Sequence, residues 1–87
     1  MIAPQTMDQR VVDKIVTALG MCLEDDELVV RGSAAVALGR IGPRAAAASA
    51  SLRRLADEDD NPQVRHVAAE ALEKIEAEAP VQPDKGE

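Results

Sequence analysis

Two stretches of this 87-residue chain are almost the same: residues 30–41 read VRGSAAVALGRI, and residues 64–75 read VRHVAAEALEKI. Nine of the seventeen residues from 25 to 41 are identical to the residue found 34 positions later. A fixed period of this kind is typical of repeat proteins, in which each repeat is one supersecondary unit that packs against its neighbours. The chain is therefore predicted to contain two structural units in tandem.

The spacing of apolar residues predicts helices throughout the repeated region, and no β-strand pattern competes with it. The first helix is placed at about 8–23, and either Asp8 or a capping box of Thr6 and Gln9 is expected to begin it. Its apolar stripe recurs every four residues at Val11, Ile15, Leu19 and Leu23, with Val12 and Val16 beside it. The second helix follows the acidic run 24–27 and carries on one face Val30, Ala34, Ala37, Leu38 and Ile41.

Glycine and proline mark the remaining helix boundaries. Gly42 is predicted to end the second helix in a left-handed conformation, and Pro43 to begin a third helix at about 43–56. The stripe of that helix is Ala45, Ala48, Leu52, Leu55 and Ala56. Asn61 and Pro62 supply an N-cap and a first helical residue for the fourth helix. Its apolar face consists of Val64, Val67, Ala68, Ala71, Leu72 and Ile75.

These boundaries divide the chain into an N-terminal arm at 1–7, a two-repeat domain at 8–78 and an acidic tail at 79–87 that is predicted to be disordered. The first repeat spans about 8–41 and the second about 43–78. A chain of this length has room for one small domain. Two repeats leave both ends of the stack open, because about three are usually needed to bury a continuous core.

The residues within the repeat distinguish between families. Tetratricopeptide repeats share the period of about 34 residues but carry aromatic signature positions, and this chain has no Phe, Trp or Tyr. An acidic turn followed by VR, AA and AL resembles HEAT repeats, especially the short HEAT-like class found in bilin lyase subunits. The resemblance covers about residues 8–78. It implies an all-α fold: a fragment of an α–α superhelix, or solenoid, made of two hairpins and four helices.

The resemblance also assigns a structural role to the turns. In that family the turn aspartate and the arginine that follows it bond across adjacent units. An arginine in the first turn of a helix lies at the positive end of the helix dipole, so it needs nearby carboxylates. The residues expected to form this structural ladder are Asp25, Asp26, Arg31, Asp59, Asp60 and Arg65.

Composition argues against several classes of function. The net charge is −6, and a chain without aromatic residues lacks stacking platforms for bases, so direct nucleic-acid binding is not expected. No segment has the length of a membrane span or the pattern of a signal peptide. Cys22 is the single cysteine, which excludes an internal disulfide and fits the reducing cytoplasm, where the protein is expected. The small, apolar helix faces offer no cofactor pocket, so no cofactor is expected.

No set of residues predicts catalysis or metal binding. Asp57, Asp59 and Asn61 match the start of a calcium loop, but Pro62 and Ala68 occupy the positions that require glycine and glutamate. His66 is the only histidine, so one chain cannot build a His-His or His-Cys zinc site. Cys22 lies near the end of a helix, away from the positive N-terminal end that would activate a thiol. The chain is predicted not to be an enzyme.

The remaining candidate is the surface. The second helix of each HEAT-like hairpin commonly lines the face that holds a partner, and its outward positions here are Val29, Gly32, Ser33, Val36, Arg40, Glu70 and Lys74. Val36 corresponds to Glu70 in the other repeat, which leaves an apolar strip on one repeat only. We expect a non-enzymatic adaptor or scaffold that binds a protein partner, or itself as a homodimer, through this face and the open repeat ends.

Two other functions fit parts of the sequence. The carboxylates at 24–27 and 57–60 lie at the same end of the hairpins, so the chain could be a small acidic inhibitor or nucleic-acid mimic that occupies a basic groove. The same clusters also suit helix capping. The resemblance to bilin lyase subunits implies a third function, as an accessory subunit of such an enzyme, but it extends only to the repeat positions.

Overall fold

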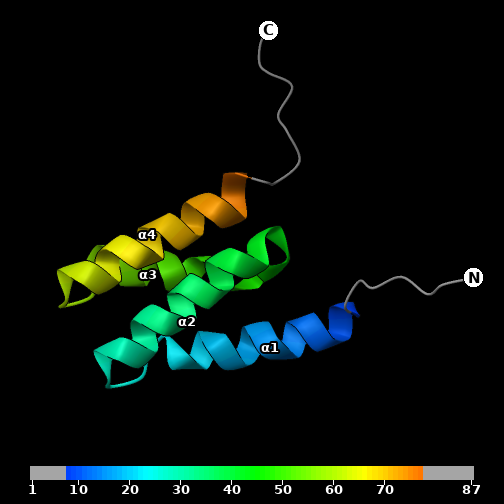
Figure 1. Cartoon of the computed structure of the whole chain (residues 1–87), viewed down its shortest axis with the longest axis horizontal. Coiled ribbons are helices and arrows are strands. Elements are labelled where there is room, and N and C mark those ends of the chain that lie inside the picture. The colour runs from blue at the N-terminus through cyan, green and yellow to red at the C-terminus, as the bar shows by residue number, and fades with distance from the viewer. Residues whose placement is uncertain (1–7, 78–87) are drawn as a thin grey trace, which may run out of the picture.

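The computed structural model describes residues 8–77, and every regular element in that range is helical (Figure 1). In chain order these are α1 (Gln9–Cys22), α2 (Leu28–Ile41), the 3-10 helix η1 (Gly42–Ala48), α3 (Ser49–Glu58) and α4 (Pro62–Ala77). The prediction of an all-α fold is confirmed. The arm at 1–7, with Thr6, and the tail at 79–87 lie outside the described residues.

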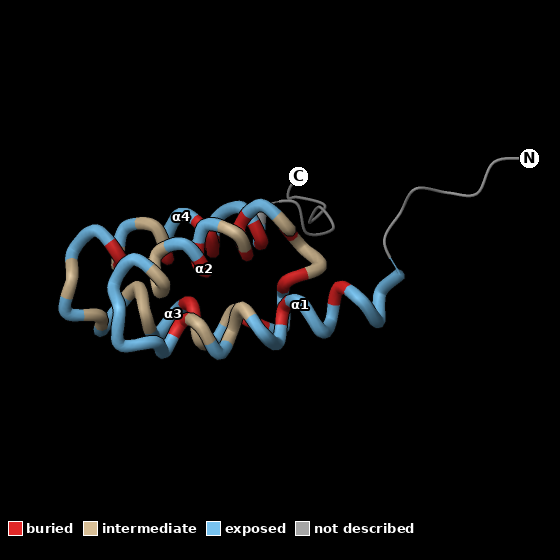
Figure 2. Tube along the Cα trace, turned by 60° about the horizontal axis from the view of Figure 1, so that its bottom comes forward, coloured by how far each residue is buried: buried red, intermediate tan, exposed pale blue. Residues whose placement is uncertain are grey.

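The helices lie in two layers. α1 and α3 form one layer, α2 and α4 form the other, and buried residues line the space between the layers (Figure 2). α4 packs against α2, α3 and η1, whereas α1 packs against α2 and η1. Figure 1 shows α2 and α4 side by side, running in the same direction. The contact between these two helices joins one repeat to the other.

Small side chains allow the helices to approach closely. The core includes Ala34, Ala35, Ala45, Ala48, Ala68 and Ala71, and its largest fully buried side chains are Leu23, Leu38, Leu52 and Val64. Each buried leucine stabilises the fold by about 2 kcal/mol. The apolar face predicted for the fourth helix is buried at Val64, Ala68, Ala71, Leu72 and Ile75, and partly buried at Val67.

The stripe predicted for the first helix is buried only in part. Val12 and Val16 are only 5% and 4% exposed, whereas Val11 and Ile15 are 45% and 36% exposed. In a helix of about 3.6 residues per turn, a stripe at every fourth residue drifts by about 40° at each step, so one face is shared by residues spaced in fours and threes. α1 therefore buries Val12, Val16 and Leu23 and leaves the side of Val11 uncovered.

The third helix begins differently from the prediction. Instead of a continuous α-helix from 43, the 3-10 helix η1 precedes α3, and Ala45 lies outside the helical region at φ −95° and ψ 15°. Side chains three residues apart eclipse in a 3-10 helix, and the buried residues of η1 are spaced by three: Gly42, Ala45 and Ala48. The tighter helix thus places all three small residues on the core side.

The capping residues follow the sequence pattern in most places. Asp8 accepts the Arg10 N–H and begins α1. Asn61 Oδ1 accepts the N–H groups of Gln63 and Val64, at 2.8 and 3.1 Å, and begins α4. Gly42 ends α2 with φ 80° and ψ −146°, a combination open essentially to glycine alone, so a residue with a Cβ would be strained there.

The two repeats approach each other closely at Gly39. A Cβ built on this residue would lie 3.0 Å from Ala71 Cα and 3.2 Å from Ala71 Cβ. Two turns earlier along the same contact, a Cβ on Gly32 would lie 3.9 Å from Val67 Cγ2, which is ordinary van der Waals distance. α2 and α4 are therefore nearly in backbone contact at the C-terminal end of α2.

We predict that Gly39→Ala destabilises the protein by about 1 kcal/mol, because the overpacking at Ala71 outweighs the gain in helix propensity. The control is Gly20→Ala in α1, where nothing lies within 4 Å of a new Cβ and the gain of up to about 1 kcal/mol should be seen. Urea unfolding followed by circular dichroism measures both. Equal stabilisation by the two substitutions would contradict the close contact.

Candidate functional site

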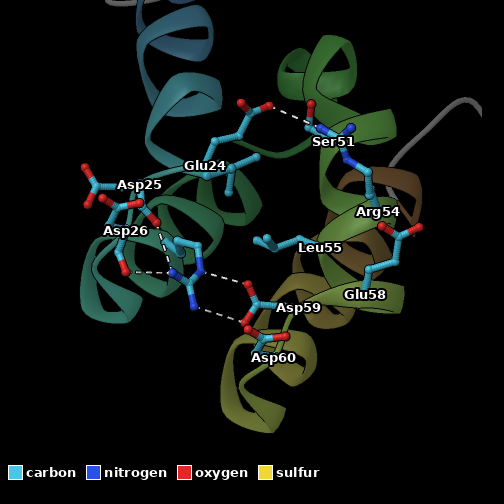
Figure 3. A pocket seen from close by; sticks show the side chains of 11 residues that line it. Glu24, Asp25, Asp26, Ser51, Arg54, Leu55, Glu58, Asp59 and Asp60 are labelled. Atoms are coloured by element: carbon cyan, nitrogen blue, oxygen red, sulfur yellow. Dashed lines mark hydrogen bonds and ion pairs between the residues drawn. The ribbon is translucent and has the colours of Figure 1, made fainter.

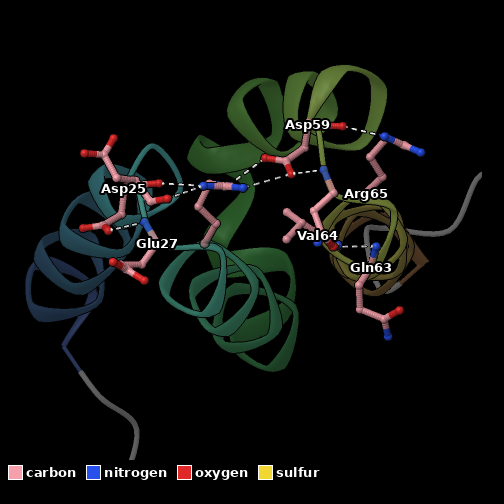
Figure 4. Close-up of polar contacts among 9 residues, drawn as sticks. Asp25, Glu27, Asp59, Gln63, Val64 and Arg65 are labelled. Carbon is pink, nitrogen blue, oxygen red and sulfur yellow. Dashed lines mark hydrogen bonds and ion pairs between the residues drawn. The ribbon is translucent and has the colours of Figure 1, made fainter.

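Arg31 connects the turns of the two repeats. Its Nε donates to Asp59 Oδ1 at 2.7 Å, and one terminal nitrogen, Nη2, donates to Asp59 Oδ2 at 3.2 Å. The other terminal nitrogen, Nη1, donates to the backbone oxygens of Asp25 and Asp26, both at 3.0 Å (Figure 4). The side chains of Arg31 and Asp59 are only 16% and 6% exposed. This guanidinium therefore binds the turn of its own repeat and the carboxylate of the next one.

The two turns are built alike. Arg65 Nη1 donates to the backbone oxygen of Asp59 at 2.6 Å, as Arg31 does to that of Asp25. Asp25 Oδ1 accepts the Glu27 N–H at 2.8 Å, and Asp59 Oδ2 accepts the Asn61 N–H at 2.9 Å. The two turns differ in the partner of the aspartate side chain. Within residues 8–77, the Asp59 carboxylate pairs with an arginine of the preceding repeat, whereas the Asp25 carboxylate pairs with no arginine.

The two remaining members of the expected ladder have smaller parts. Asp26 contributes its backbone oxygen to Arg31, and its side chain forms no hydrogen bond or ion pair with the described residues. The same holds for the side chain of Asp60, which lines the acidic depression described below. The buried ion pair between the repeats is thus formed by Arg31 and Asp59.

The environment of Asp59 favours its charged form. Burial on its own would raise the pKa of the carboxyl, but the Asn61 N–H and the Arg31 guanidinium outweigh that effect and hold the pKa below its ordinary value of 3.8. The charge of Arg65 acts in the same direction. Asp59 is therefore ionised at neutral pH and paired with Arg31.

Both acidic turns border one depression, which has a volume of about 570 Å³ (Figure 3). Its carboxylates are those of Glu24, Asp25, Asp26, Glu58, Asp59 and Asp60. Arg31 neutralises Asp59, and Arg54 pairs with Glu24 at 3.1 Å on the surface. The depression keeps an excess of negative charge at the end of the molecule where the turns lie.

Two of the three candidate calcium residues have other partners in the structure. Asp59 binds Arg31, and Asn61 caps α4. Among residues 8–77, no group of three or more His, Cys, Asp or Glu side chains is arranged to hold a metal ion. His66 is exposed and lies 3.2 Å from Glu70 one turn further along α4, while Cys22 is half-buried.

An apolar groove separates α2 from α4 on the outer side of their layer. It is lined by Leu28, Val29, Gly32, Ser33, Val36, Ala37, Arg40, Gln63, Val64 and Val67. Five of the seven residues expected on the partner-binding face are among them: Val29, Gly32, Ser33, Val36 and Arg40. Val29 is 68% exposed, and Leu28 and Val36 are 47% and 43% exposed. This is the most exposed apolar strip on α2.

The structure does not bring the other two predicted residues into this groove. Glu70 and Lys74 are exposed on α4, where Glu70 contacts His66 and the Lys74 side chain runs past Gly39. Both residues are exposed, as predicted, but neither lines the α2–α4 groove. Leu28 was missed because it directly follows the acidic run, although its apolar character in the first turn of α2 was a usable signal.

Comparison with known families decides the identity of the fold. A family model for HEAT repeats matches residues 3–79. The chain belongs to the HEAT repeat family. No curated protein and no solved structure matches the chain. Within residues 8–77, none of the helices combines the length and the apolar character that a membrane span requires.

The bond between the two HEAT units should be visible in the pH dependence of stability. A folded pKa below the unfolded one means that Asp59 stabilises the fold above about pH 4, and that this contribution is lost as the pH falls through the folded pKa. Asp59→Asn should therefore lower the free energy of unfolding by about 2 kcal/mol at neutral pH. The difference in unfolding free energy from the unsubstituted protein should narrow as the pH falls below 3.8 and Asp59 takes up its proton.

Asp25→Asn is the matched control, because it changes the same residue type at the equivalent position of the other HEAT unit. Asparagine accepts the capping N–H bond at both sites, so the two variants differ in the loss of the Arg31 pair. Asp8, whose pKa is lowered by hydrogen bonds from Arg10, is present in all three proteins and cancels. Urea titrations across this pH range measure the effect, and a gap that stays constant would contradict it.

Proposed function

We propose that the chain is a two-repeat fragment of an α-solenoid that acts as a non-enzymatic protein-interaction module, an adaptor or scaffold. The observation that supports this most strongly is the groove between α2 and α4, where Leu28, Val29 and Val36 expose apolar surface. Membership in the HEAT repeat family agrees with such a role, because stacked helical repeats present extended binding surfaces.

The dimensions of the groove suit an α-helix. From Leu28 to Arg40 it follows α2 over a length of about 18 Å, at about 1.5 Å per residue. A partner helix of three to four turns matches this length and would insert apolar residues spaced by threes and fours. Ser33 and Gln63 add hydrogen-bonding groups to an otherwise apolar lining.

The charges beside the groove favour one orientation of that partner. Arg40 lines the groove near the C-terminal end of α2, and Lys74 lies close by on α4. The opposite end lies next to the acidic turn at 24–27. A partner helix with acidic residues near Arg40 and basic residues near the acidic turn complements both ends, which would fix its direction.

We predict that Val36→Glu weakens partner binding by about tenfold or more, because the apolar contact of Val36 is lost and the carboxylate loses its hydration when the partner covers it. The second repeat already has glutamate at the equivalent position, Glu70, so the substitution should leave the helix content unchanged. Val11→Glu is the control. Val11 is exposed to a similar degree on α1 and does not line the groove.

The partner is first isolated with the tagged protein from its host, and its affinity for each variant is then measured by calorimetry. A protein that binds the Val11→Glu variant normally and the Val36→Glu variant weakly supports the groove. Equal binding by both variants would remove the α2–α4 groove from the proposal, while circular dichroism confirms that each variant is folded.

The acidic depression supports a second candidate function, as an inhibitor or mimic that occupies a basic groove. The supporting observation is that carboxylates of both turns border the same depression and outnumber its two arginines. Binding through this surface should weaken steeply with added salt, whereas apolar docking in the α2–α4 groove should not. The salt dependence of the isolated complex therefore separates the two proposals.

A further inference from the structure

The surface of α4 that receives α2 has a counterpart on the first repeat. α2 packs on α4 near Val64, Val67, Ala68 and Ala71, with Gly32 facing Val67 and Gly39 against Ala71. The residues 34 positions earlier are Val30, Ser33, Ala34 and Ala37. All four line a second groove between α1 and α2, together with Leu19, Cys22 and Val29. We call this the α1–α2 groove.

Burial shows that the counterpart surface is uncovered. Val64 and Ala71 are buried beneath α2, whereas their equivalents Val30 and Ala37 are only partly buried. Val67 is partly buried and its equivalent Ser33 is exposed. Three of the four positions thus lose exposure in the second unit, where α2 covers them, while Ala34 and Ala68 are buried in both units.

The polar anchor is duplicated as well. Asp25 is the equivalent of Asp59, the residue that binds Arg31 from the neighbouring repeat. The Asp25 carboxylate is exposed, and among the described residues it accepts the Glu27 N–H and no guanidinium. The first repeat therefore presents an apolar groove and the Asp25 carboxylate at the same repeat positions as the α4 surface and the Asp59 carboxylate that α2 contacts.

We propose that the α1–α2 groove binds the second helix of a HEAT-type hairpin from a partner protein, anchored by an arginine of that helix on Asp25. The proposal rests on the role of the chain as an interaction module. The α1–α2 groove lies on the other side of α2 from the α2–α4 groove and shares with it Val29, Ser33 and Ala37, but not Val36. The partner helix needs the pattern that α2 shows on its docking side: an arginine in the first turn, then small residues as at Gly32, Ala35 and Gly39.

A second copy of this chain does not fit that description. The residues of α4 equivalent to Arg31, Gly32 and Gly39 are Arg65, His66 and Glu73. Even a Cβ at the position of Gly39 comes within 3.0 Å of the facing helix, so the longer side chain of Glu73 has no room there. His66 and Glu73 are exposed, which makes the outer face of α4 a polar end for the stack.

The test adds one hairpin to the full chain. Inserting a copy of residues 9–42 in front of residue 9 keeps Gly42 at the end of the copied second helix and places the arginine of the copy 28 residues before Asp25, the same separation as between Arg31 and Asp59. The copied cysteine is replaced by serine, so that Cys22 of the original repeat is the single thiol. Because the added hairpin is covalently attached, its high effective concentration removes any dependence on a weak partner.

The rate at which Cys22 reacts with a soluble aromatic disulfide measures occupancy of the groove. Docking should slow this reaction by about tenfold or more relative to the natural chain, because the covered thiol reacts only when the hairpin opens. Gly39→Glu in the added copy, which imitates Glu73, should restore the original rate. An added hairpin that leaves the rate unchanged overturns the proposal.

A charge exchange tests the anchor itself. Asp25→Arg should abolish the protection of Cys22, and Arg31→Asp in the added copy should restore it in that variant. Protection that survives Asp25→Arg overturns the anchor. Val36→Glu should leave protection intact, so a failure of the α2–α4 groove as a binding site is distinguished from a failure of this proposal. Sedimentation of the natural chain should show a monomer, and a dimer with a protected Cys22 would make a second copy the occupant.

Discussion

The arrangement of the two repeats depends on the hydrogen bonds and the ion pair that the Arg31 guanidinium forms. It contacts the backbone of one acidic turn and the carboxylate of the next, and it is mostly buried in doing so. A buried ion pair adds little net stability compared with apolar packing, since both groups lose their hydration. Its cost when broken is much larger, because a single unpaired charge remains. We attribute to this pair the alignment of the repeats more than their cohesion.

The composition of the helix faces explains why alignment needs a polar anchor. α2 and α4 meet through glycine and alanine, with Gly39 almost touching the backbone at Ala71. Such flat faces pack closely, but they lack the large side chains that lock one helix against sliding along another. The bonds of Arg31 prevent sliding at one end of the contact, and the close packing at Gly39 prevents it at the other.

Much of this fold could be predicted because it depends on local sequence patterns. The repeat period, the Asn61 cap, the glycine at position 42 and the buried face of α4 each depend on residues near one another in sequence. The 3-10 form of η1 could not be predicted, because spacings of three and four residues overlap in an alanine-rich stretch. The exposure of Val11 could not be predicted either, because it depends on the tertiary packing around α1.

The candidate site divides in the same way. Helical periodicity identified Val29 and Val36 as outward residues, and both line the α2–α4 groove. It could not place Glu70 and Lys74, since membership in a groove depends on the tilt between neighbouring helices. The difference between the two ends of the repeat pair could not be predicted either. Only the close packing at Gly39 shows that a side chain as large as Glu73, at the equivalent position of α4, does not fit such a contact.

The most direct measurement is a double-mutant cycle on Arg31 and Asp59. Urea unfolding gives the free energies for the unsubstituted protein, Arg31→Gln, Asp59→Asn and the double variant. If this pair aligns the repeats, the two substitutions are coupled by about 1–2 kcal/mol, and the double variant is less destabilised than the sum of the single ones. A coupling energy near zero would contradict the account, because apolar packing and the exposed polar contacts would then hold the repeats in place without this pair.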